Sequence, residues 1–336
     1  MISRRTRAIG QWGLVAVFIS ILLYFGDVSE LFRMPTIHWP FILLVFLSTV
    51  GFTLIHNIRW TTLVKGISST SIDPKIGFFQ FYHWLLNSYA LGTMIPNDIS
   101  LAGVRTFYMN RTQILSFPLA LFSVLLDRFF DFIVFFALAI PSALFMTKVA
   151  NGTGALFYLG CIMALIFLFI FWKKGEGVDS LMRIYRSGMN WLSKLPIIGK
   201  RIGGKWMEVS DKTSFREGSV HQLMGWSFLK YFFLALRFYF TGQVFGVDFS
   251  LLQGFFFIPF IQLVGMLNIT PGGLGIMEMG SYGALKFMEV PETKIMVFVV
   301  GQRILLSCII IGLALMNQLL YFIQSRWRRL GGIEWK

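Results

Sequence analysis

Six apolar runs of about membrane-spanning length constrain this chain more than any other feature. A bilayer core of about 30 Å requires roughly 17–25 apolar residues in a helix. The runs are Ile9–Gly26, Trp39–Trp60, Leu115–Met146, Gly154–Trp172, Leu223–Phe245 and Lys294–Gln324. Because the bilayer core offers no water to backbone groups, a spanning segment of this kind is helical. The sequence therefore predicts an all-α polytopic membrane protein with about six full spans.

The composition fits the same class of protein. Charged residues make up only 14% of the 336 residues, whereas soluble domains carry about 25%. The net charge of +14 does not indicate a nucleic-acid partner, because Lys and Arg of membrane proteins collect in cytoplasmic loops and face anionic lipid. Cys161 and Cys308 lie in apolar runs and show no metal or disulfide spacing. We expect no nucleic-acid partner and no cofactor.

Two further apolar stretches are interrupted by helix-breaking residues. Ile76–Pro96 contains Gly92 and ends at Pro96, and Leu251–Leu285 is cut by Asn268–Gly273. Proline removes a backbone donor and glycine loosens a helix, so neither stretch is predicted to form one straight span. We expect each to form a re-entrant helical hairpin.

The distribution of Lys and Arg predicts the orientation in the cytoplasmic membrane. Basic residues begin and end the chain, and the segment 173–222 carries ten Lys or Arg against five Asp or Glu. Both termini and this loop are therefore expected on the cytoplasmic side. Within the loop, apolar residues from Leu181 to Leu195 recur at helical spacing. This pattern indicates either an amphipathic helix on the anionic inner leaflet or a solvated connector of two short helices.

A weak internal repeat relates the two halves of the chain. A shift of 175 residues places Pro96 on Pro271 and Arg128 on Arg303. The repeat predicts two units, 39–147 and 223–324, inside a single transmembrane domain that covers 1–336. Opposite orientation of two such units is the inverted-repeat plan of many transporters, which place the substrate site between them near the midplane.

Charged residues inside the apolar runs are the first candidates for binding. Asp127, Arg128 and Asp131 lie near one helical face. Each charge at the bilayer centre costs at least about 2.5–3.5 kcal/mol, so these side chains are not expected to face lipid. They form either a structural ion pair or a site for an anionic headgroup. Arg59 is interpreted as a cytoplasmic anchor at the end of its helix.

The two hairpins supply the other candidates. A helix that begins beyond Gly272 and Gly273 can direct free N–H groups at an anion, with Glu278 about one turn inside; the alternative is a simple helix-breaking turn. In the first hairpin, Arg105 can bind a phosphate or extend to the interface. The expected substrate-binding residues are Arg105, Asp127, Arg128, Asp131, Asn268, Pro271, Gly272, Gly273, Glu278 and Arg303. The four histidines show no metal-ligand spacing, and no catalytic motif is present, so an enzyme is not expected.

These motifs together resemble the flippase-like transmembrane domain family, also called the lysylphosphatidylglycerol synthase transmembrane region. The resemblance rests on four elements that keep their order and spacing over nearly the whole chain. They are Ile95-Pro96 through Arg105, Asp127-Arg128-x-x-Asp131, Pro271-Gly272-Gly273-Leu274-Gly275 with Glu278, and Arg303. One departure is Ser100-Leu101-Ala102, where family members often carry Gly-Gly-Asp; it puts an acid role at the first hairpin in doubt.

The resemblance implies a stand-alone membrane domain without the aminoacyltransferase domain of some members. The implied function is a lipid flippase or lipid-linked glycan transporter that moves an anionic headgroup between leaflets. Its partners would be a phospholipid or polyprenyl-phosphate-linked lipid, anionic inner-leaflet lipids and a lipid-modifying enzyme. Two alternatives stay open: an accessory or scaffolding subunit of a membrane lipid- or sugar-transferase system, and an ion-coupled transporter of a polar solute.

Overall fold

The computed structural model describes most of both predicted units and little of the chain outside them. The described residues are 37–67, 77–149, 151–160, 219–265 and 273–331, with single residues at 162, 187 and 270. The predicted span Ile9–Gly26 lies outside them, as do most of Gly154–Trp172 and the loop 173–222 with its amphipathic pattern. The described part of the chain forms helices and turns and contains no strand, which confirms the all-α prediction.

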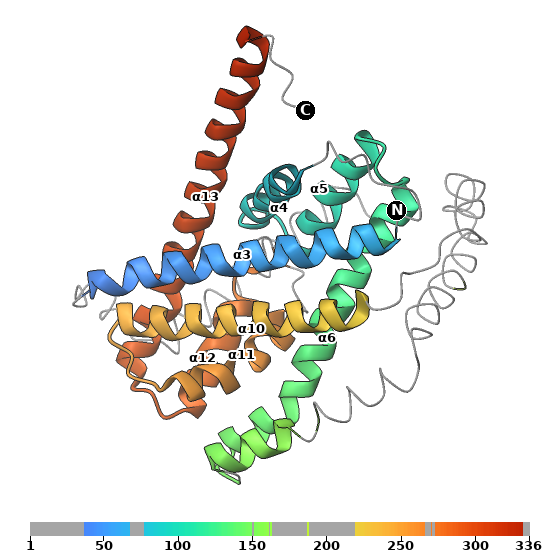
Figure 1. The fold of residues 1–336 in the computed structure, drawn as a ribbon. Coiled ribbons are helices and arrows are strands. Elements are labelled where there is room, and N and C mark those ends of the chain that lie inside the picture. The colour runs from blue at the N-terminus through green and yellow to red at the C-terminus, as the bar shows by residue number, and fades with distance from the viewer. Residues whose placement is uncertain are drawn as a thin grey trace, which may run out of the picture.

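The helices follow the same order in both units. The first unit contains α3 (Trp39–Ile67), α4 (Phe78–Gly92), α5 (Asn97–Arg111) and α6 (Phe117–Met146). The second contains α10 (Ser219–Val244), α11 (Leu251–Gly265), α12 (Ile276–Phe287) and α13 (Glu292–Gly331). Each is thus a long helix, two short helices and a long helix (Figure 1). A 15-residue helix is about 22 Å long, which is less than a bilayer core needs.

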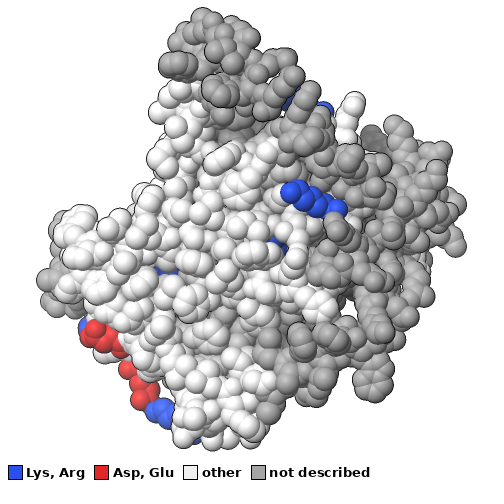
Figure 2. All heavy atoms as spheres, in the orientation of Figure 1, with Lys and Arg blue, Asp and Glu red and all other residues white. Residues whose placement is uncertain are grey.

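Three of the long helices have the length and apolar composition needed to cross a membrane. Within the described residues these segments are Trp39–Ile67, Phe117–Met146 and Glu292–Ile323. Their presence makes the chain a multi-pass membrane protein. α10 is also long, but it carries Lys230 and Arg237. In the face shown in Figure 2, residues other than Lys, Arg, Asp and Glu cover most of the described surface, and the acidic side chains that are visible lie at its lower left edge.

Glycine and proline separate the short helices where the sequence predicts a break. α4 ends at Gly92, and α5 begins directly after Pro96. A Cβ atom on Gly92 would lie 2.4 Å from Oδ1 of Asn97, so a larger residue would require the Asn97 side chain to move. Before α12, Gly273 and Gly275 have φ angles of 73° and 85°, which L residues with side chains rarely adopt. Both breaks are therefore local properties of the sequence.

The two units meet along α3 and α10, which lie side by side and antiparallel (Figure 1). At one end, the amide of His38 donates to the carbonyl of Val244 over 3.2 Å. At the other end, Ile67 belongs to the same apolar cluster as Leu223. α6 and α13 run across this pair. The largest contact between the units is thus made by one long helix from each, and α6 with α11 and α4 with α13 extend it.

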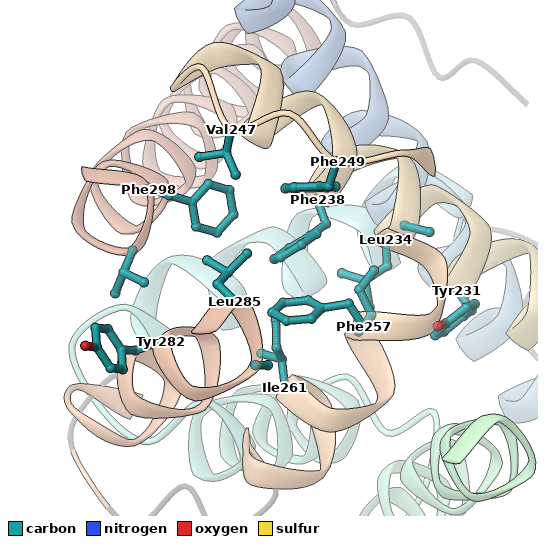
Figure 3. Close-up of a cluster of buried hydrophobic side chains, with 14 of the residues drawn as sticks. Tyr231, Leu234, Phe238, Val247, Phe249, Phe257, Ile261, Tyr282, Leu285 and Phe298 are labelled. Atoms are coloured by element: carbon teal, nitrogen blue, oxygen red, sulfur yellow. The ribbon is translucent and has the colours of Figure 1, made fainter. Parts of the chain in front are cut away.

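An aromatic core packs the second unit together (Figure 3). The ring of Phe238 on α10 lies 4.8 Å from that of Phe257 on α11 and 5.2 Å from that of Phe298 on α13. Leu285 of α12 joins the same cluster and is fully buried. Since lipid tails are as apolar as these side chains, close packing rather than exclusion from water holds such helices together in a bilayer.

Candidate functional site

A cavity of about 440 Å³ lies where the ends of the two short-helix pairs approach α6, α10 and α13. The first pair contributes Gly92 and Asn97, and the second contributes Gly265 and Met277. The charged and amide side chains on its wall are Asn97, Asp98, Arg128, Asp131, Lys230, Arg237, Gln262, Glu278, Gln302 and Arg303. Four of these are cations and three are carboxylates, so the cavity is suited to a polar or charged ligand.

Arg128 lies on the cavity wall and forms an ion pair with a residue of α5. Its Nη2 atom is 2.7 Å from Oδ1 of Asp98, which lies in the first turn of α5. Its Nη1 atom is 3.8 Å from Oδ2 of Asp131. The Arg128 side chain remains 28% exposed and that of Asp98 48% exposed. The pair therefore connects α6 to α5 without being sealed from the cavity.

Arg303 has a corresponding arrangement in the second unit. Its Nη1 atom lies 3.6 Å from Oε1 of Glu278, in the first turn of α12. The other carboxylate oxygen of Glu278 accepts a 2.7 Å hydrogen bond from the amide of Gly275. That N–H group is therefore satisfied by the helix's own glutamate rather than left free for a ligand. Each unit thus pairs an arginine of its last helix with an acid at the start of its second short helix.

Asp127, next to Arg128, lies in a sealed ionic cluster outside the cavity wall. Its Oδ1 atom accepts a 2.9 Å hydrogen bond from Nε of Arg59, and its Oδ2 atom lies 2.9 Å from Nη1 of Arg105. The ring of His56 completes the cluster, with Nε2 at 2.8 Å from the same Oδ2 and Nδ1 hydrogen-bonded to Tyr89. Arg59, Asp127 and His56 have no exposed surface. The cluster joins α3, α5 and α6.

Asp131 connects the sealed cluster to the cavity. Its Oδ1 atom accepts a hydrogen bond from Nη1 of Arg59, and its carboxylate lies 2.7–2.8 Å from Nζ of Lys230. Arg59 also donates to Oγ of Ser227 on α10 over 3.0 Å. These bonds extend the network from the first unit to α10 of the second.

The structure separates the predicted site residues into three groups. Arg128, Asp131, Glu278 and Arg303 come together on the cavity wall. Arg105 and Asp127 are buried in the ionic cluster instead, so Arg105 does not extend to the interface. Gly273 sets the turn before α12. Asn268, Pro271 and Gly272 lie outside the described residues.

Interpreting Arg59 as a cytoplasmic anchor was wrong. α3 continues past Trp60 to Ile67, because Leu63, Val64 and Ile67 are buried in apolar clusters that extend the helix. Arg59 therefore lies inside the protein rather than at its surface.

Four residues of the ionic cluster or the cavity wall were not among the predicted site residues: His56, Tyr89, Lys230 and Arg237. A signal for two of them is present in the sequence, because Lys230 and Arg237 are seven residues apart and lie on one face of α10. His56 and Arg59 are likewise three apart on α3. Within the described residues, no group of three or more His, Cys, Asp or Glu is placed to hold a metal ion.

Comparison with known proteins gives one family match. The family model described as Lysylphosphatidylglycerol synthase TM region matches residues 9–314, which is most of the chain. The match includes both short-helix pairs and the cavity between them, and it confirms the resemblance in the motifs. No curated protein matches the chain.

Proposed function

Since the chain belongs to the family of the lysylphosphatidylglycerol synthase transmembrane region, we propose that it carries a lipid with an anionic headgroup between membrane leaflets. The family match makes the chain a membrane protein of a lipid-related, flippase-like group. The substrate class is a phospholipid or a polyprenyl-phosphate-linked lipid. The chain binds and moves this lipid and breaks no covalent bond in it.

The cavity is the observation that carries the proposal. Arg128 and Arg303 line it from α6 and α13, and Lys230 and Arg237 line it from α10. Cations held away from lipid by the surrounding helices can compensate a headgroup phosphate at membrane depth. A cavity of about 440 Å³ is large enough for a headgroup. The acyl chains then remain outside the protein in the bilayer.

An inverted repeat would explain how such a cavity opens to either side. The 175-residue shift carries Phe117, the first residue of α6, onto Glu292, the first residue of α13. The antiparallel contact between α3 and α10 is what two units of opposite orientation would give. In this proposal α4–α5 and α11–α12 are re-entrant hairpins that enter from opposite faces, and both termini lie on the cytoplasmic side of the cytoplasmic membrane.

Two kinds of partner follow from the proposal. The basic loop 173–222 would rest on anionic lipids of the inner leaflet. A lipid-modifying enzyme would supply or consume the lipid that is moved.

Reconstitution of the purified chain in liposomes tests the function. Phosphatidylglycerol with a fluorescent headgroup is placed in both leaflets, and the fraction that a membrane-impermeant quencher reaches is followed with time. The wild type should exchange the lipid between leaflets, and Arg128→Ala and Arg303→Ala should slow this exchange strongly. Lys286→Ala is the matched control, because this lysine is exposed and pairs with Glu292 away from the cavity.

The outcomes separate the proposed function from its alternatives. Unchanged exchange in both arginine variants would remove the basis of the mechanism. A wild-type protein that binds the lipid but never moves it would favour an accessory subunit of a transferase system. Solute transport that depends on a pH gradient, without any lipid movement, would favour an ion-coupled transporter of a polar solute.

A further inference from the structure

Arg237 differs from the other cations on the cavity wall in having no acidic partner among the described residues. Arg128 lies 2.7 Å from Asp98, Lys230 lies 2.7 Å from Asp131, and Arg303 lies 3.6 Å from Glu278. For Arg237 the structure shows neither an ion pair nor a side-chain hydrogen bond, within the ranges it describes. Its contact is with an aromatic ring.

That ring belongs to Phe52 of α3. The guanidinium carbon of Arg237 lies 4.8 Å from the ring centroid. Lys230, seven residues earlier on α10, places its Nζ atom 5.6 Å from the same centroid. The negative face of an aromatic ring attracts a cation. This contact does not use the guanidinium N–H groups as hydrogen-bond donors. The ring therefore holds the guanidinium in place while its donors remain available.

A cation at membrane depth without a counter-ion is costly, so proteins pair such residues with an acid, a carbonyl or a ligand. The described surroundings of Arg237 supply the aromatic ring and no acid. Other polar atoms of residues on the same cavity wall are also unsatisfied. Oε1 of Gln302 has no hydrogen-bond partner, and Nη2 of Arg128 approaches Asp98 outside hydrogen-bond geometry.

We propose that Arg237 is the phosphate-binding residue of the cavity, holding a phosphate group bidentately while its guanidinium rests on Phe52. A planar guanidinium presents parallel N–H donors that match two phosphate oxygens. Arg128 and Arg303 then add positive charge to the same cavity, and their ion pairs also tie α6 and α13 to the two short-helix pairs. The inference rests on the proposed function in one respect: the phosphate is that of a lipid headgroup in the cavity.

Equilibrium binding to the purified full chain in neutral detergent tests this role. The probe is phosphatidylglycerol with a fluorescent acyl chain, and diacylglycerol with the same chains is the ligand without phosphate. The wild type should bind the phospholipid more tightly than the diacylglycerol. Arg237→Gln should weaken phospholipid binding at least about tenfold, the size expected for losing a charge-assisted hydrogen bond, and should leave diacylglycerol binding unchanged.

Lys294→Gln is the matched control. The change removes one positive charge from an exposed side chain near Asp248. Neither Lys294 nor Asp248 is part of the cavity wall. This variant should bind both ligands as the wild type does. Equal phospholipid binding by Arg237→Gln and Lys294→Gln would overturn the proposal.

Arg237→Lys keeps the inference testable if the glutamine variant does not fold. A lysine keeps the charge but lacks the planar pair of donors, so binding should fall by about threefold or more. Wild-type affinity in this variant would overturn bidentate binding. Competition with inorganic phosphate identifies the source of the ligand: displacement of the probe indicates that free phosphate also binds, and its absence indicates that the lipid headgroup is required.

The binding assay is independent of transport. If Arg237→Gln binds phospholipid normally while the wild type exchanges lipid between leaflets, the inference fails and the proposed function stands. If Arg237→Gln loses binding and the wild type moves no lipid, the phosphate site stands and the proposed function fails.

Discussion

The interiors of the two units contain different kinds of buried side chains, although both units follow the same order of helices. The first unit contains a buried apolar cluster and, in addition, buried charges: Asp127 binds Arg59, Arg105 and His56. The second is packed by the aromatic cluster around Phe238, to which α3 and α6 of the first unit also contribute. The 175-residue shift pairs His56 with Tyr231 and Arg59 with Leu234, and both second-unit residues belong to that cluster.

This difference separates residues that position the site from residues that line it. The arginines on the cavity wall, Arg128 and Arg303, are the same in both units, whereas the interior behind them is not. Ionic bonds are directional and fix helix rotation, whereas aromatic packing tolerates small adjustments. The first unit should therefore be the more rigid wall of the cavity, and the second the wall that adapts.

Asp127→Asn should have the largest effect on this contrast. The change leaves the buried guanidiniums of Arg59 and Arg105 without their shared carboxylate, and breaking a buried ion pair in this way costs about 3–5 kcal/mol. Thermal unfolding in detergent, followed by size-exclusion chromatography, measures the loss. Asp98→Asn, at a half-exposed pair, should cost less than about 1 kcal/mol. Equal unfolding temperatures for the two variants would contradict a sealed cluster.

Glu278→Ala should have the next largest effect, because this residue has two roles in the second unit. Its carboxylate accepts from the amide of Gly275 and lies near Arg303. Loss of such a helix cap costs about 1–2 kcal/mol. Glu278→Gln keeps an acceptor for the Gly275 amide and should lose less stability in the same assay. Identical losses in both variants would show that the charge matters and the cap does not.

Phe298→Leu tests the aromatic cluster of the second unit. Phe298 is fully buried against Phe238, so a smaller side chain leaves a cavity and costs about 1 kcal/mol. The measurement is again the unfolding temperature, with Phe322→Leu on the exposed part of α13 as the control. If the buried change cost as much as Asp127→Asn, the two interiors would not differ in the way described.

The smallest effect is expected at the exposed pair of Lys148 and Glu289. The Lys148 ammonium, 2.7 Å away, holds the pKa of the Glu289 carboxyl below its ordinary value. A lowered pKa means that the pair stabilises the fold above the ordinary glutamate pKa, and that this contribution disappears as the pH falls through the lowered value. Unfolding temperatures of the wild type and Glu289→Gln should therefore differ slightly at neutral pH and converge in acid. A difference that widened in acid would contradict this sign.

The breaks between the short helices could be predicted from the sequence because their causes are local. Pro96 lacks a backbone donor, and Gly275 adopts a φ angle that other residues avoid. The end of α3 could not be predicted in the same way. The helix continues past Trp60 because Leu63 and Ile67 find apolar partners on α6 and α10, and those partners lie far away in the sequence.

The roles of neighbouring charges also depended on tertiary packing. Asp127 and Arg128 are adjacent in the sequence, but one residue along a helix turns the side chain by about 100°. Asp127 therefore points into the sealed cluster, whereas Arg128 lines the cavity. Nothing in the local pattern fixes which of the two directions faces the cavity.

The sequence by itself determined that the chain is a helical membrane protein, where its short helices break, and that charged residues lie within long apolar helices. These features follow from hydropathy and backbone chemistry, which act within a few residues. The tertiary structure decided which charges meet. The bonds of Asp127 to Arg59 and His56 join residues 68 and 71 positions apart, and the place of Arg237 depends on a phenylalanine of another helix. Such pairings depend on how the helices pack, and no local pattern encodes them.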